Sequence, residues 1–233
     1  MHNDIRATLN YFIYDFRFTI SIFWVVLCSS LVVLSIASLS LDSIVRINTS
    51  LAVYIYAAIA GFSITKEIFP NCIKMGATRN NYIIAASFFA ILFAIFMSAM
   101  NLLVSFIFQL IITSPELSNL AIFYTLDATT LSFTWFNHFF IDFVICLFII
   151  SVGFFSSAIF YRFGLIGGFV NLALLGIFIL IPNLRDLFID FVMSIEGRTI
   201  DLNFGAVTIV VITFIFLTWL VLRRASLVQS VSR

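Results

Sequence analysis

Charge is scarce in this sequence. Only 10% of its 233 residues are Asp, Glu, Lys or Arg, and just two are Lys. In a soluble domain, about a quarter of all residues are charged. Such a chain cannot cover a water-facing surface with charged side chains. In contrast, 63% of the residues are hydrophobic and 30 are Phe, which is stable in hydrocarbon. We therefore expect an all-α polytopic membrane protein, and the net charge of +1 gives no indication of a nucleic-acid partner.

Motifs for catalysis and metal binding are also missing. The sequence has no G-x-x-x-x-G-K-[ST] loop for phosphates, no H-E-x-x-H, no C-x-x-C and no G-x-S-x-G. Its three cysteines, Cys28, Cys72 and Cys146, are too far apart in sequence for the usual zinc or disulfide patterns. We expect no metal site, no bound cofactor and no enzymatic activity in the chain itself.

Long apolar runs are what the sequence does contain. A helix needs about 20 predominantly apolar residues to cross the hydrocarbon core. Six segments qualify as transmembrane helices, namely 18–41, 49–65, 82–112, 135–160, 164–181 and 204–222. The third is long enough to tilt or to project beyond the bilayer. Six spans place both termini on the same side of the membrane.

The basic residues predict which side that is. Nine of the twelve Lys and Arg residues fall in the terminal segments and in the loops after the second and fourth spans. Cytoplasmic segments carry the excess of positive charge, so we expect a multi-pass plasma-membrane protein with both termini cytoplasmic. The N-terminal segment mixes acids with bases and has no cleavage site typical of a signal peptide, so the first span is expected to stay in the mature protein.

Two segments outside the spans have amphipathic patterns. Residues 3–17 carry apolar side chains at helical spacing, which predicts an N-terminal interfacial helix; an extension of the first span is the alternative. Residues 183–202 combine apolar and acidic side chains, which predicts an extracellular amphipathic segment with a short helix at the outer surface.

Residues 66–82, KEIFPNCIKMGATRNNY, interrupt the apolar sequence with both lysines and strong helix signals. Pro70 is suited to the first turn of a helix, and Gly76 to the position just past a helix end. Thr78 can cap the N-terminus of the third span. The pattern predicts a short transverse helix within residues 67–76, on the cytoplasmic face.

This short helix has more apolar surface than a solvated loop needs. We predict that it docks against a partner protein through an apolar ridge with charge at its rim. The residues assigned to this site are Glu67, Ile68, Phe69, Pro70, Ile73, Lys74, Met75, Gly76 and Arg79.

Ionisable residues inside a span indicate function, because burying them without partners is unfavourable. His138 and Asp142 are four residues apart, so they share one helix face and can pair. Two interpretations stay open, proton coupling through this pair or simple hydrogen bonding near the outer end of the fourth span. We expect Asn101, Gln109 and Asn171 to act as hydrogen-bond partners between helices.

With its six spans, cytoplasmic termini, interfacial helix and short helix after the second span, the chain resembles the ABC-2 type permeases, the membrane subunits of ATP-driven exporters. The stretch MGATRNNY, residues 75–82, is similar to the G-x-[ST]-R-x-x-[YF] stretch of small Gram-positive permeases, some of which export phenol-soluble modulins or lantibiotics. The resemblance implies a coupling helix at residues 67–76, which docks onto a separate cytoplasmic ATPase subunit that binds the ATP. It also implies a second permease copy or a paralogue, membrane lipid around the chain, and an amphipathic or hydrophobic substrate, such as a peptide, that is moved outward.

Two alternatives to an ATP-driven exporter stay open. The first is a proton-coupled secondary transporter that uses His138 and Asp142. The second is a membrane protein that binds peptides without transporting them, such as an immunity or sensor subunit.

Overall fold

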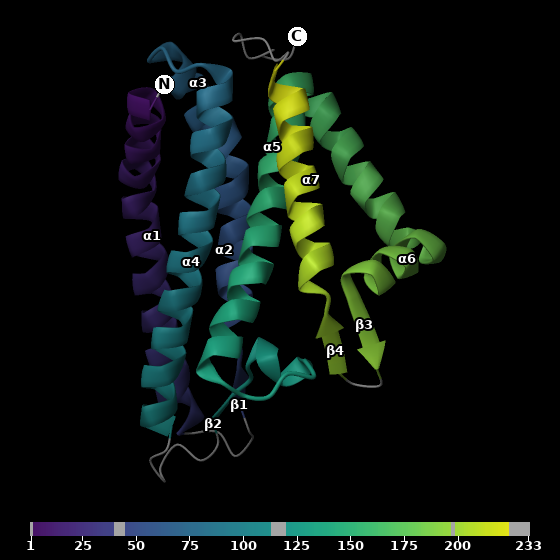
Figure 1. The fold of residues 1–233 in the computed structure, drawn as a ribbon. Helices are drawn as coiled ribbons and strands as arrows, with labels where there is room; N and C mark the ends of the chain where they lie inside the picture. Colours follow the sequence, from purple (N-terminus) through teal and green to yellow (C-terminus); the bar gives the residue numbers. More distant parts are fainter. Residues whose placement is uncertain (1, 40–44, 113–119, 197–198, 224–233) are drawn as a thin grey trace.

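A computed structural model describes residues 2–39, 45–112, 120–196 and 199–223 of the chain. Within them, five helical stretches are long and apolar enough to cross a membrane: Ile5–Ser38, Thr49–Lys74, Arg79–Ile112, Trp135–Leu180 and Phe204–Arg223. The corresponding elements are α1 (His2–Ser38), α2 (Thr49–Ser63), α4 (Arg79–Ile112), α5 (Trp135–Leu180) and α7 (Phe204–Arg223), which form an all-α bundle (Figure 1). The second stretch also includes the two short elements that follow α2, η1 (Ile64–Ile68) and α3 (Phe69–Lys74). Arg198, Arg224 and Arg233, which contributed to the charge count, lie outside the described residues.

The fourth and fifth predicted spans correspond to one long element, α5. Its helical geometry is interrupted at Gly164, whose φ of 67° is in the region that glycine tolerates. This residue separates a first arm, residues 135–163, from a second arm, residues 165–180, which turns back along the bundle (Figure 1). The sequence therefore located the break correctly. That the second arm crosses the membrane by itself stays a prediction.

The N-terminal segment differs from the expected interfacial helix. Residues 3–17 belong to α1, which continues without a break from His2 to Ser38 and is drawn as one straight helix in Figure 1. The segment contains no Gly or Pro at which the helix would bend. A separate helix at residues 3–17 is therefore wrong for this structure, and these residues extend the first long helix instead.

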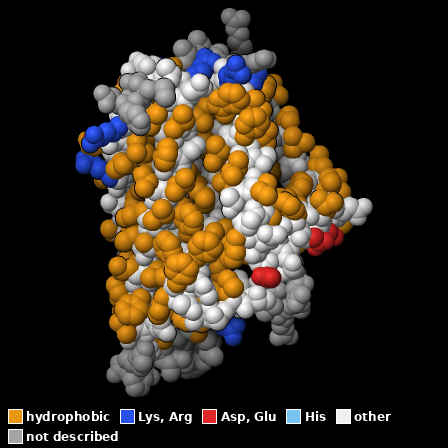
Figure 2. All heavy atoms as spheres, viewed as in Figure 1, with side chains coloured by type: hydrophobic (Ala, Val, Ile, Leu, Met, Phe, Trp, Pro, Cys, Tyr) orange, Lys and Arg blue, Asp and Glu red, His pale blue; other side chains and the backbone are white. Residues whose placement is uncertain are grey.

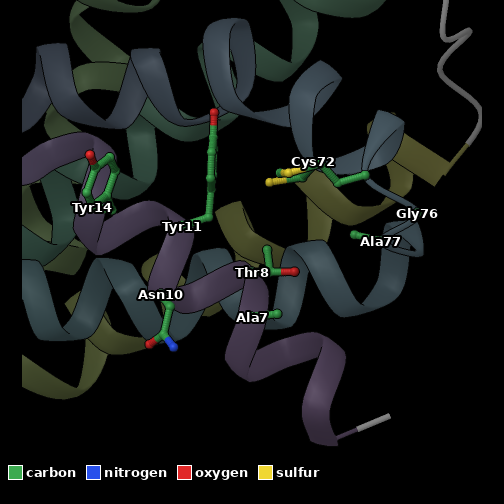
Figure 3. Close-up of a pocket in the computed structure, with 9 residues that line it drawn as sticks. Ala7, Thr8, Asn10, Tyr11, Tyr14, Cys72, Gly76 and Ala77 are labelled. Atoms are coloured by element: carbon green, nitrogen blue, oxygen red, sulfur yellow. The ribbon is translucent and has the colours of Figure 1, made fainter.

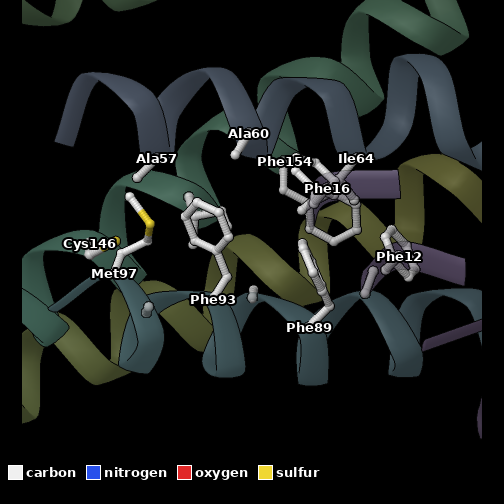
Figure 4. Close-up of a cluster of buried hydrophobic side chains, with 14 of the residues drawn as sticks. Phe12, Phe16, Ala57, Ala60, Ile64, Phe89, Phe93, Met97, Cys146 and Phe154 are labelled. Carbon is white, nitrogen blue, oxygen red and sulfur yellow. The ribbon is translucent and has the colours of Figure 1, made fainter. Parts of the chain in front are cut away.

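Aromatic side chains fill the core between α1 and α4. Phe12 and Phe16 of α1 contact Phe89 of α4, with ring centroids 5.1 and 4.9 Å apart, and Phe93 continues the same row (Figure 4). Because lipid is as apolar as these rings, close packing rather than the hydrophobic effect must hold the helices together.

Small residues bring α2 and α5 into backbone contact. A Cβ atom added to Gly61 of α2 would lie 2.4 Å from the Ile150 carbonyl oxygen, and one added to Gly153 of α5 would lie 2.6 Å from that of Ala58. Both distances are shorter than any real contact, so larger residues would push the two helices apart. Helix pairs in membranes commonly approach through such small residues.

Short strands connect the helices. Strand β1 (Val45–Ile47) pairs in parallel with β2 (Leu120–Ile122), and β3 (Met193–Glu196) pairs antiparallel with β4 (Thr199–Leu202). The amphipathic helix expected within residues 183–202 is present only as α6 (Pro182–Val192), and the rest of that segment is the β3–β4 hairpin. The β-branched residues Thr199 and Ile200 favour a strand there, a local signal that the sequence reading overlooked.

The two ends of the bundle differ in charge. Helix α1 begins and α7 ends at the same end of the molecule, which we call the α3 end because the short helix α3 lies there (Figure 1). Most of the Lys and Arg side chains visible in Figure 2 lie at this end, whereas the visible acidic side chains lie around α6 and the hairpin. This distribution agrees with the charge asymmetry along the sequence.

Candidate functional site

The short helix expected between the second and third spans is present. Helix α2 passes through a π-helical turn, η1 (Ile64–Ile68), into α3 (Phe69–Lys74), which has Pro70 in its first turn. At its C-terminus, the Gly76 N–H donates to Ile73 and the Ala77 N–H to Cys72, both at 3.0 Å, while Gly76 has a φ of 92°. These two bonds form a Schellman motif, which ends a helix at a glycine.

The next helix starts immediately after this motif. Thr78 precedes α4, and its hydroxyl accepts a hydrogen bond from the Asn81 N–H at 3.3 Å. The Tyr82 hydroxyl of α4 donates to the Ile64 carbonyl at 2.6 Å and so attaches α4 to the start of η1. The helix boundaries expected from Pro70, Gly76 and Thr78 are all found in the structure, and α3 lies between α2 and α4 in the chain.

The predicted apolar ridge, Ile68, Phe69, Ile73 and Met75, is only partly at the surface. Ile68 and Phe69 are only 1% and 0% exposed, and the Phe69 ring packs edge-on against Tyr82 and Tyr161 at 4.9 and 5.1 Å. Neither side chain can contact a partner protein, so their assignment as docking anchors is wrong. The reason is that α3 follows α2 with only η1 between them, and its first turn still faces the interior of the bundle.

Other residues form the exposed side of residues 67–76, which we call the α3 segment. Met75 is 61% exposed, and Glu67, Asn71 and Lys74 are also exposed, while Pro70 and Ile73 are half-buried. Arg79 is not free at the rim, since its guanidinium donates to the carbonyl of Arg223 at the end of α7. Arg162 donates to the neighbouring Val221 carbonyl at 3.2 Å, so two arginines satisfy the last turn of α7, as is favourable at a helix C-terminus.

A groove separates the N-terminal part of α1 from α3. Its volume is about 580 Å³. Figure 3 shows the side chains of Tyr11 and Thr8 on one wall and Cys72 on the other, and Met75 also lines the groove. The Asn71 amide donates to the Tyr11 hydroxyl at 3.4 Å and bridges the two walls. The groove therefore adjoins the exposed side of the α3 segment.

A buried polar cluster lies around Asp142, toward the opposite end of the bundle. The Asp142 carboxylate accepts hydrogen bonds from Tyr54 and Ser50 of α2 and from Asn101 of α4, the last at 2.6 Å. The second amide hydrogen of Asn101 goes to Ser50 at 2.9 Å. One carboxylate thus joins α2, α4 and α5.

His138 completes this cluster. Its Nδ1 lies 3.4 Å from the nearer Asp142 oxygen, and both side chains are buried. The ring of Tyr124 covers the imidazole edge-on at 5.0 Å, and burial, with the nearby Asp127 carboxylate, raises the pKa of the Tyr124 hydroxyl. The pairing expected from the four-residue spacing is therefore possible, although the carboxylate takes its hydrogen bonds from other helices.

The sequence reading identified only part of this cluster. Asn101 makes the hydrogen bonds between helices that were expected of it, whereas Gln109 lies exposed on α4 and Asn171 half-buried on the second arm of α5. Ser50 and Tyr54 were missed. Their four-residue spacing in an apolar span was the signal that could have found them, because it places both on one helix face.

Comparison with known proteins adds nothing to this picture. No protein-family model matches the sequence, and no curated protein or solved structure matches it significantly. The comparisons assign no family. The resemblance to ABC-2 type permeases therefore rests on the sequence and topology features described above.

Proposed function

We propose that this chain is the membrane-spanning permease subunit of an ATP-binding cassette exporter. The observation that carries this proposal is the α3 segment, a short helix with a defined start and end that projects at the basic end of the bundle. Under this proposal the basic end faces the cytoplasm. A separate ATPase subunit binds and hydrolyses ATP there, and the permease has no catalytic role.

The docking surface consists of the exposed residues of the α3 segment. Met75 provides an apolar contact beside the α1–α3 groove, and Lys74 and Glu67 provide charges of opposite sign around it. A side chain that protrudes from the ATPase can enter the groove between α1 and α3. Apolar anchors that fill a pocket with charge at the rim are typical of protein interfaces.

The buried residues of the same segment then transmit movement. Phe69 contacts Tyr82 of α4 and Tyr161 of α5, and Arg79 bonds to the last turn of α7. A displacement of α3 by the ATPase would therefore reach α4 and α5 directly, and α7 through Arg79 at the start of α4. This assigns Ile68 and Phe69 a role in coupling instead of docking.

A transport pathway requires more than this one chain. We propose that two copies, or one copy and a paralogue, enclose the pathway within the plasma membrane. The substrate class that fits the Phe-rich helices is an amphipathic or hydrophobic molecule such as a peptide. Closure of two ATPase subunits drives the permease between inward-facing and outward-facing states.

The docking proposal can be tested by purification from native membranes. We expect an ATPase subunit to co-purify with the wild-type chain. We expect it not to co-purify with the double variant Met75→Asp, Lys74→Glu, because the first change places a charge at an apolar contact and the second reverses the sign of the charge at position 74. Asp186→Lys on α6, an exposed change in the acidic region, is the matched control. An ATPase that co-purifies equally with the docking variant would exclude this surface.

A second candidate function is proton-coupled transport, which the His138–Asp142 contact favours. In vesicles without ATP, such a protein would transport its substrate in response to a pH gradient, and the variants His138→Gln and Asp142→Asn would abolish this response. Transport that needs ATP and persists in His138→Gln would exclude the second candidate.

A further inference from the structure

An apolar pocket lies between α2 and the two arms of α5. Its volume is about 300 Å³, at the lower end of the range typical of ligand pockets. Phe62 of α2 and Phe160 of the first arm form one side, and Phe169, Leu172 and Leu175 of the second arm form the other. The pocket runs along the second arm and is lined mainly by apolar side chains, so a hydrocarbon chain can lie in it.

A positive charge lies beside this pocket. The Lys66 amine is 5.9 Å from the centre of the Phe62 ring and 6.0 Å from that of Phe160, and both rings line the pocket. Lys66 is exposed, and it has no ion-pair partner among the described residues. An unpaired ammonium group at the mouth of an apolar slot is complementary to an anionic head group on an apolar tail.

Two polar side chains lie deeper in the pocket. Ser156 is one helical turn, about 6 Å, further from the α3 end than Phe160, and Asn171 faces the pocket from the second arm. Within the described part of the chain, neither side chain forms a hydrogen bond. The head-group region of a bilayer leaflet is about 5–8 Å deep, which is comparable to the rise of one helical turn between Phe160 and Ser156.

We propose that this pocket binds one anionic phospholipid. The phosphate lies against Lys66, the ester carbonyls accept hydrogen bonds from Ser156 and Asn171, and one acyl chain lies along Leu172 and Leu175. The charge, the donors and the apolar slot follow one another in the order in which a phospholipid presents its phosphate, esters and tail. The site is independent of any ATPase and of the transport function proposed above.

Lipid selectivity of the purified protein tests this site. The protein in detergent is mixed with either phosphatidylglycerol or phosphatidylcholine of identical acyl chains, and bound lipid is counted by native mass spectrometry. We expect the wild type to bind phosphatidylglycerol about fivefold more tightly, the effect of one lysine near an anionic group. Lys66→Gln should remove this preference, whereas Lys74→Gln, the matched change in α3, should keep it.

A second pair of variants tests the acyl-chain slot. Leu172→Trp fills the pocket and should reduce binding of both lipids, while Leu174→Trp, on the same arm but outside the pocket, should leave it unchanged; the two leucines are 64% and 59% exposed. Equal binding of the two lipids by the wild type would overturn the proposal. So would equal effects of Lys66→Gln and Lys74→Gln, or efficient disulfide cross-linking of Leu172→Cys between two copies in membranes, which would mean that a second chain covers the pocket.

Discussion

The two ends of this bundle are stabilised in different ways. Toward one end, the buried carboxylate of Asp142 is held by donors from α2 and α4 and lies beside His138. At the α3 end, aromatic packing and helix caps hold α3, and a groove of about 580 Å³ separates it from α1. A buried carboxylate that accepts hydrogen bonds from two other helices has few alternative arrangements, whereas a capped helix beside a groove can shift as a unit. The difference predicts that the Asp142 end is the more rigid part of the bundle and the α3 end the more movable part.

The most damaging change should be the loss of the Asp142 carboxylate. Asp142→Leu would remove the acceptor of the Ser50 hydroxyl and of one Asn101 amide hydrogen, while Tyr54 would keep only its weaker bond to Thr125, and we expect it to lower the free energy of unfolding by about 3–5 kcal/mol. Asp142→Asn keeps the shape of the side chain and should lower the free energy of unfolding by about 1–3 kcal/mol. Thermal unfolding in detergent measures both, with the exposed Asp186→Ala as the control. If Asp142→Leu is as stable as the wild type, this cluster does not fix the bundle.

The next largest effect concerns Phe69 at the α3 end. Phe69→Ala removes a fully buried ring that contacts Tyr82 and Tyr161, so we expect a loss of about 3 kcal/mol. Met75→Ala, in the same segment but 61% exposed, should change stability by less than about 0.5 kcal/mol. The same unfolding assay compares the two variants. The reverse order of effects would mean that Phe69 faces outward after all and that the predicted docking ridge was correct.

The smallest effect is expected at the glycine that ends α3. Gly76→Ala places a Cβ atom on a residue with a φ of 92°, and should cost about 1–2 kcal/mol although the space around it is open. Gly176→Ala adds the same atom in open space within a helix, where alanine is favoured by about 0.5–1 kcal/mol. Gly76→Ala should therefore lower the midpoint of thermal unfolding, and Gly176→Ala should raise it. Shifts of the same sign would argue that the Schellman motif does not stabilise this end.

Local signals predicted the helix boundaries around α3 well. Pro70, Gly76 and Thr78 act at their own positions, through backbone geometry and caps that involve only near neighbours, so the sequence is sufficient to place them. The break in α5 was predicted from the bounds of two apolar runs, residues 135–160 and 164–181, and in the structure Gly164 provides the conformation that the break requires.

Local signals failed where the direction of a side chain depends on distant residues. Ile68 and Phe69 have the composition of a docking ridge, but the aromatic residues that surround Phe69 come from α4 and α5. Likewise, the sequence paired Asp142 with His138, which is near in the chain, and missed Ser50 and Tyr54, about 90 residues away. Spacing along one helix cannot show which other helix lies opposite.

The sequence by itself determined that the chain is helical and apolar enough to span a membrane, how its basic residues are distributed, and where the helices around α3 start and stop. These properties depend on composition and on interactions within a few residues. The tertiary structure decided which side chains of the α3 segment are exposed, which donors surround Asp142, and that Lys66 lies over the two rings that line the α5 pocket. Each of these depends on packing between helices, and in an apolar chain that packing is set by the shapes of facing side chains rather than by a pattern of polar and apolar residues.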